Sequence, residues 1–91
     1  MAKTDIFYYV GVKYAKEAQS EEAKGRCDNA LCLLAEKWGQ RYMGTNEHIE
    51  DADLEFGFPE ANRKSALSFL EEALDSGHAA HVGIAKGDRD F

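Results

Sequence analysis

Apolar residues recur at helical spacing between Ser20 and Met43. They are separated by three or four positions, with charged residues filling most positions between them: Cys27, Ala30, Leu31, Leu34, Ala35, Trp38 and Tyr42. Such spacing places one apolar stripe on one face of a helix. Ser20 is a favourable N-cap residue, and Gly44 suits the position just past a helix end. The pattern predicts a helix over residues 20–43.

A second apolar stripe predicts a helix from Pro59 to Ser76, with Gly77 as its stop. Proline is tolerated in the first turn, and glycine is favoured just after the last. The stripe consists of Ala66, Phe69, Leu70, Ala73 and Leu74, and Leu67 widens it. A stripe of this kind usually packs into a protein core.

Residues 5–14 fit two patterns. Phe7, Val10 and Tyr14 lie at helical spacing, whereas Ile6, Tyr8, Val10 and Val12 alternate as in a strand. A strand needs a mate, and the chain offers only the short stretch 81–85 or the same segment of a second copy. We therefore predict an all-α fold, a small antiparallel bundle of three to four helices in a single domain over residues 1–91. The alternative is an α+β fold with an N-terminal strand at 5–14.

Some apolar positions resemble the tetratricopeptide class of helical repeats. The matching residues follow the order of about one repeat: Phe7, Val10, Gly11, Tyr14, Ala23, Cys27 and Ala30. The stretch 64–87 is similar to the related Sel-type repeats. The resemblance implies an all-helical protein-binding module and carries over no catalytic residue.

Negative charge gathers in one segment of the chain. The 91 residues have a net charge of −6, and 11 Lys and Arg face 17 acids. Six of those acids lie between residues 47 and 60, so the segment accounts for the whole net charge. Residues 45–58 are predicted to form an acidic connection between the two helices. The negative field disfavours direct nucleic-acid binding and favours a protein partner with a basic surface.

The acidic segment does not match a calcium loop. Asp51, Asp53 and Glu55 alternate as EF-hand ligands do, but Phe56 stands where the loop needs glycine and Asn62 where it needs glutamate. His78 and His81 supply only half of a transition-metal site. We therefore expect no metal, no cofactor and no enzymatic activity.

No apolar run reaches the length of a signal peptide or of a membrane span. Cys27 and Cys32 diverge too far around a helix to form a disulfide. The protein is therefore expected to be cytoplasmic, with reduced thiols.

The first functional hypothesis is a small adaptor or assembly module that uses a helical face and exposed aromatics, with homodimerisation as a further expectation. Tyr8 and Tyr9 cannot both join the helix face of Phe7, Val10 and Tyr14. At least one large ring is then left for a partner.

The alternative is an acidic mimic of nucleic acid, such as a phage-encoded blocker of a nuclease or CRISPR effector. Its carboxylates would occupy arginine and lysine sites meant for phosphates. The residues assigned to this contact are Glu47, Glu50, Asp51, Asp53 and Glu55, with Phe56 and Phe58 as apolar anchors.

Overall fold

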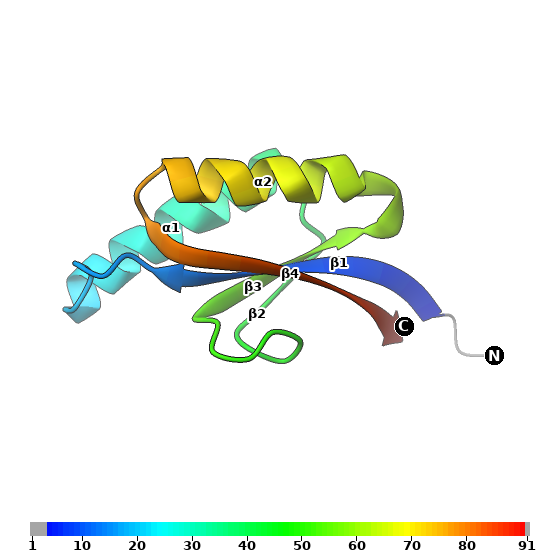
Figure 1. The fold of residues 1–91 in the computed structure, drawn as a ribbon, viewed down its shortest axis with the longest axis horizontal. Helices are drawn as coiled ribbons and strands as arrows, with labels where there is room; N and C mark the ends of the chain where they lie inside the picture. The colour runs from blue at the N-terminus through cyan, green and yellow to red at the C-terminus, as the bar shows by residue number, and fades with distance from the viewer. Residues whose placement is uncertain (1–3, 91) are drawn as a thin grey trace.

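The computed structural model describes residues 4–90, which form one antiparallel sheet with two helices on one face (Figure 1). In chain order the elements are β1 (Thr4–Tyr14), α1 (Glu21–Lys37), β2 (Tyr42–Gly44), β3 (Leu54–Pro59), the 3₁₀ turn η1 (Glu60–Asn62), α2 (Arg63–Asp75) and β4 (Ala79–Asp90). The strand order is β2-β3-β1-β4. The prediction of an all-α helical bundle is therefore wrong, and the fold is α+β.

β1 is a strand because it lies in the middle of the sheet and pairs on both sides. Phe7 pairs with Pro59 of β3 and with Gly87 of β4, and the pairing continues to Val12. The predicted mate at 81–85 lies inside β4. The helical prediction for 5–14 is wrong because β1 has a second partner strand, β3. This strand begins at Leu54, inside the stretch 45–58 predicted as an acidic connection, so the connection ends at Asp53.

α1 begins as predicted, since the Ser20 hydroxyl accepts a hydrogen bond from the Ala23 amide (3.1 Å). The helix ends at Lys37 rather than Met43, because Gly39 has a φ of 81° and turns the chain towards β2. Glycine adopts that conformation at no steric cost.

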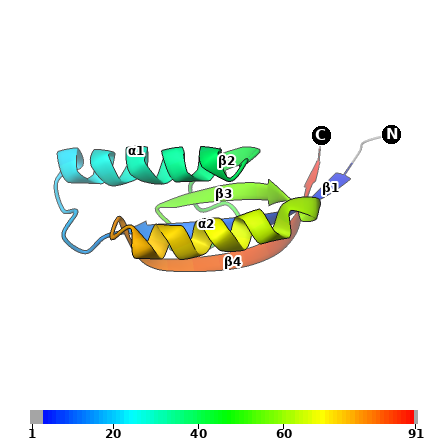
Figure 2. The same ribbon diagram turned by 90° about the horizontal axis from the view of Figure 1, so that it is seen from above.

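α2 runs over residues 63–75 and not from Pro59, which closes β3. Gly77, with a φ of 79°, follows its end, so the predicted stop is confirmed. From above, α2 lies over β1 and β4, while α1 lies towards β2 and β3 (Figure 2).

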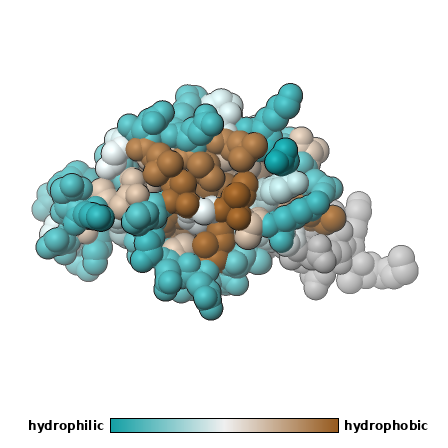
Figure 3. Space-filling model, in the orientation of Figure 1, coloured by the Kyte–Doolittle hydropathy of each residue, from teal (hydrophilic) through white to brown (hydrophobic). Residues whose placement is uncertain are grey.

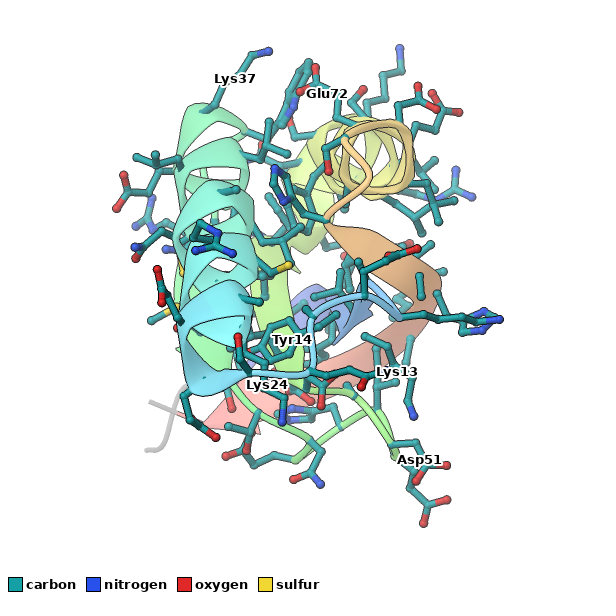
Figure 4. All side chains as sticks on the ribbon, turned by 90° about the vertical axis from the view of Figure 1, so that its left-hand side faces the viewer. Lys13, Tyr14, Lys24, Lys37, Asp51 and Glu72 are labelled. Atoms are coloured by element: carbon teal, nitrogen blue, oxygen red, sulfur yellow. The ribbon has the colours of Figure 1, made fainter. Side chains whose placement is uncertain are left out.

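The core lies between the helices and the sheet. Phe69 of α2 packs against Phe56 and Phe58 of β3, with ring centroids 5.2 and 5.6 Å apart. On the outer surface Lys37 of α1 and Glu72 of α2 form an ion pair of 3.1 Å (Figure 4). The two helices thus lie side by side above a phenylalanine-rich core.

The positions that resemble a tetratricopeptide repeat are divided between β1 and α1. Phe7, Val10, Gly11 and Tyr14 belong to β1, and only the later positions are helical. The all-helical fold that the resemblance implies is therefore wrong for this chain.

Candidate protein-binding surface

Residues 45–53, the part of the acidic segment that precedes β3, fold back over the face of the sheet that the helices leave open. Glu55 of β3 binds them there. The Glu55 side chain has 0% exposure. Its Oε1 accepts hydrogen bonds from the backbone amides of His48 (2.9 Å) and Ile49 (3.2 Å). Its Oε2 shares a hydrogen bond with Nδ1 of the His48 ring. One buried carboxylate thus clamps the segment to the sheet.

Aromatic stacking and a glycine complete this attachment. The His48 ring lies on the Tyr9 ring, with centroids 3.6 Å apart and planes 5° apart, and the Tyr42 ring meets it edge-on. A Cβ added at Gly11 would lie 2.8 Å from the Ile49 side chain. Gly11 is therefore required for the close approach of the segment to β1.

Two more carboxylates of the segment are bound within the chain. Glu47 accepts from the Tyr42 hydroxyl (2.9 Å) and from the Thr45 amide (3.1 Å). The hydrogen bond from Tyr42 is the main reason that the pKa of Glu47 lies below its usual value. Asp53 accepts from the Tyr14 amide (2.9 Å).

Glu50 and Asp51 are the exposed remainder of the predicted acidic contact. Asp51 has a φ of 64°, a left-handed conformation that aspartate tolerates. It lies on the opposite side of the sheet from Lys37 and Glu72 and points away from it (Figure 4). Neither carboxylate has a hydrogen bond or ion pair among residues 4–90 in this structure.

Burial removes most of the predicted aromatic contacts from the surface. Tyr9, Phe56 and Phe58 each have 0% exposure, and both phenylalanines lie in the core. Glu55, which the mimic also needs, is equally buried. The nucleic-acid-mimic hypothesis is therefore wrong, since its anchors face inward and three of its five carboxylates are bound to groups of the same chain.

Tyr8 is the one predicted aromatic that reaches the surface. It is half-buried on the helix-covered face of the sheet. The Arg63 guanidinium and the Lys86 ammonium lie 5.9 and 5.7 Å from its ring centroid. Cations at this distance from an aromatic face are attracted to it. Two positive charges, from Arg63 and Lys86, therefore lie over the Tyr8 ring beside β4.

β4 forms a long edge of the sheet. Within residues 4–90 it pairs with β1 on one side only. From Ala79 to Gly87 it has no proline and no carboxylate, and Lys86 is its one Lys or Arg. Natural sheets usually protect an edge with charges, proline or bulges. In β4 the register shifts near its start, opposite Lys13 and Tyr14, and its last three residues are charged, so the least protected part is residues 81–85. Because β4 pairs with β1 on one side only, the backbone amide and carbonyl of every second residue point outward, where another strand can pair with them.

An apolar row borders this edge. Leu67, Leu70 and Leu74 of α2 line one side of the helix, next to Val82 and Ile84 of β4. Leu74 is 43% exposed and Ile84 is 40% exposed. Figure 3 shows the apolar surface gathered over α2 and β4. Exposed apolar surface of this kind marks protein-interaction sites.

A cavity lies on each side of β4. The helix-side cavity, about 200 Å³, is lined by Tyr8, Arg63, Leu67, Ile84, Ala85 and Lys86. The sheet-side cavity, about 230 Å³, lies between β4 and the acidic segment; its lining includes Gly11, Lys13, Ile49, Asp51, His81 and Gly83.

Sequence reasoning misses this surface almost entirely. In the helical pattern, Leu67 only widens the stripe of α2. That widening is the available signal, because within the stripe only Ala66, Phe69 and Ala73 have 0% exposure, while Leu67 and Leu70 keep part of their surface exposed. A stripe broader than its buried face indicates a second contact.

Among the described residues 4–90, no group of three or more His, Cys, Asp or Glu side chains is arranged to hold a metal ion. Neither α1 nor α2 has the length and apolar character needed to cross a bilayer.

Comparison with known proteins identifies the fold. No family model and no curated protein matches the sequence. The structure is similar to the apo form of CPII from Thiomonas intermedia, a nitrogen regulatory PII-like protein, at 11% identity and a TM-score of 0.51; the match covers 100% of this chain and 97% of that one. A PII-like signaling protein from Thermus thermophilus matches at 10% identity and a TM-score of 0.47, over 99% and 90% of the two chains. At these identities the likeness to CPII shows the fold alone.

Proposed function

We propose that this chain is a non-enzymatic protein-binding module, an adaptor or assembly protein, that holds its partner along the edge of β4. The observation that carries the proposal is the long unpaired edge bordered by the apolar row of α2.

Strand addition is the binding mode that this edge supports. A strand laid against β4 gains backbone hydrogen bonds, which give affinity, while pockets for alternate side chains give specificity. Leu74 and Ile84 would lose their remaining exposed surface. Burying a partly exposed side chain of this size contributes about 1 kcal/mol. The mode differs from the helical face with exposed aromatics that the sequence predicted, although Tyr8 lies in the same region.

The exposed acids give the partner a second contact. Glu50 and Asp51 line the sheet-side cavity. A partner with a basic surface beside its strand would meet these two carboxylates, which are free of internal ion pairs in the described part of the chain. Exposed charge pairs of this kind add more to the rate of association than to affinity.

Two variants and a matched control test the proposal. Leu74→Glu and Ile84→Lys place charge on the apolar row, whereas Leu33→Glu places charge on α1 at a residue that is 67% exposed. Each tagged variant is first checked for a native melting transition and then used to capture proteins from cells of the source organism. We expect the same specific protein with wild type and Leu33→Glu, and its loss with the other two. Equal capture by all four would contradict the proposal.

A further inference from the structure

We infer that the occupant of the β4 edge is an extended strand of a different protein, and that this strand inserts a large apolar side chain into the sheet-side cavity over Gly83. The inference rests on the proposed function and specifies its partner.

Gly83 is a glycine that the chain itself does not require. A Cβ added there would meet nothing within 4 Å, and its φ lies outside the left-handed range. Each other strand glycine in residues 4–90 has a neighbour that a Cβ would meet: Gly11, Gly44, Gly57 and Gly87. Glycine weakens a strand, and one retained in a strand marks a place where a ligand or another backbone comes close. At an open edge, that approaching group comes from outside the chain.

The two cavities match the alternation of an added strand. A residue directly opposite Gly83 would point to the same face as Gly83, over the sheet-side cavity. The next residue, opposite Ile84, would point into the helix-side cavity. A dry apolar cavity of about 150 Å³ accommodates benzene. The sheet-side cavity, at about 230 Å³, therefore has room for a phenylalanine ring.

A second copy of this chain would not fill these cavities. The residues of β4 that face the sheet side are His81, Gly83, Ala85 and Gly87. In an antiparallel twofold pairing centred on Gly83, the second copy places only glycine and alanine over the sheet-side cavity. The register that places the second copy's His81 opposite Gly83 leaves only Ala80 opposite Ile84. The filling side chain therefore comes from another sequence.

The charges beside the helix-side cavity specify a further residue of the partner. Lys86 is paired with Glu60 at 2.9 Å. Arg63 has no ion pair among residues 4–90, and its guanidinium lies over the Tyr8 ring. A carboxylate opposite Lys86 would lie near the Arg63 guanidinium, which binds carboxylates in two-pronged geometry. Read from its N-terminus, a partner strand antiparallel to β4 therefore has an acidic residue opposite Lys86 and any residue opposite Ala85. An apolar residue opposite Ile84 and a large apolar residue opposite Gly83 follow.

Synthetic peptides test this assignment on the intact protein. The probe carries the core Glu-Thr-Val-Phe between flanking threonines, and its matched control has alanine in place of phenylalanine. Binding is followed by the amide chemical shifts of ¹⁵N-labelled protein. We expect the probe to shift the β4 amides and to bind at least tenfold more tightly than the control. Equal binding of the two peptides would overturn the inference.

Gly83→Val supplies the second arm. Valine favours strands, and a Cβ at this site meets no atom within 4 Å, so the melting temperature of Gly83→Val should equal or exceed that of wild type. It occupies the sheet-side cavity, so binding of the phenylalanine peptide should fall at least tenfold. Unchanged binding would overturn the inference. If Gly83→Val does not fold, Gly83→Ala replaces it, with the same two readouts.

Light scattering across a concentration series separates this inference from the proposed function. A monomer is expected. A dimer that Ile84→Lys dissociates would overturn the heterologous partner while leaving protein binding at β4 intact. If Leu74→Glu and Ile84→Lys capture the same partner as wild type does, the proposed function itself is overturned.

Discussion

Replacing Glu55 by alanine should lower the free energy of unfolding by about 3–5 kcal/mol. The carboxylate is fully buried and serves the His48 amide, the Ile49 amide and the His48 ring. Each of the two amides left without its acceptor costs about 1–3 kcal/mol, and the lost contact with the His48 ring adds to this. Domains of this size are stable by about 5–15 kcal/mol. One carboxylate thus accounts for a large share of the stability.

Two further variants divide this loss between its contributions. Glu55→Gln keeps an oxygen acceptor for the two amides and should lose only about 1–2 kcal/mol. A double-mutant cycle of Glu55→Ala with His48→Ala isolates the contact between the ring and the carboxylate. We expect a coupling of about 1–3 kcal/mol.

Urea unfolding followed by circular dichroism measures these differences. Glu50→Gln is the matched control, because Glu50 lies in the same segment, is exposed and makes no hydrogen bond or ion pair in the described residues. It should stay within about 0.5 kcal/mol of wild type. Hydrogen exchange gives a local readout, since the amides of His48 and Ile49 should exchange faster in Glu55→Ala than in wild type, by a larger factor than the amides of α2.

The clamp is refuted if Glu55→Ala loses no more stability than Glu50→Gln. It is also refuted if the amides of His48 and Ile49 keep their protection without the carboxylate. Either result would mean that stacking on Tyr9 and the packing of Ile49 on Gly11 hold the segment alone.

Three other predictions follow from the core, the acidic segment and α1. Phe69→Ala should lose about 3–5 kcal/mol in urea unfolding, because it opens a cavity against both β3 phenylalanines; a loss below about 1 kcal/mol would contradict that packing. The lowered pKa of Glu47 stabilises the fold above the ordinary value of 4.5, and this stabilisation is lost as pH falls through the lowered value, so Glu47→Gln or Tyr42→Phe should flatten the acid limb of a stability–pH curve. Burial, with Asp28 nearby, raises the pKa of Cys32 to about 11, so iodoacetamide at pH 8 should alkylate it about tenfold more slowly than a free thiol, because the smaller thiolate fraction outweighs its higher nucleophilicity; equal rates would exclude the raised value.

The parts of the fold that depend on local pattern could be predicted from sequence. The start of α1 at Ser20 and the end of α2 at Gly77 follow from cap chemistry within a few residues. The sheet depends on pairings across the chain, which local periodicity does not contain. In β3 the buried Glu55 interrupts what would otherwise be an apolar run, so the strand resembles an acidic loop.

The candidate surface was harder to predict for a related reason. β4 contains Gly83 and Gly87, which lower strand propensity, so its extent was not visible. The charge count shows where the acids lie along the chain but contains no information on their hydrogen bonds. Only the folded arrangement shows that Glu47, Asp53 and Glu55 are bound internally while Glu50 and Asp51 are exposed.

The central position of β1 has a consequence for synthesis on the ribosome. β1 is translated before both of its partners, β3 and β4, and its register with β4 pairs Thr4 with Asp90. The nascent strand therefore leaves the exit tunnel with both edges unpaired and stays so until β3 has emerged. Closing such distant contacts is slow, and unpaired strand edges are prone to aggregate. Cotranslational protection of residues 4–14, by a chaperone or by transient helix formation, would raise the yield of folded protein.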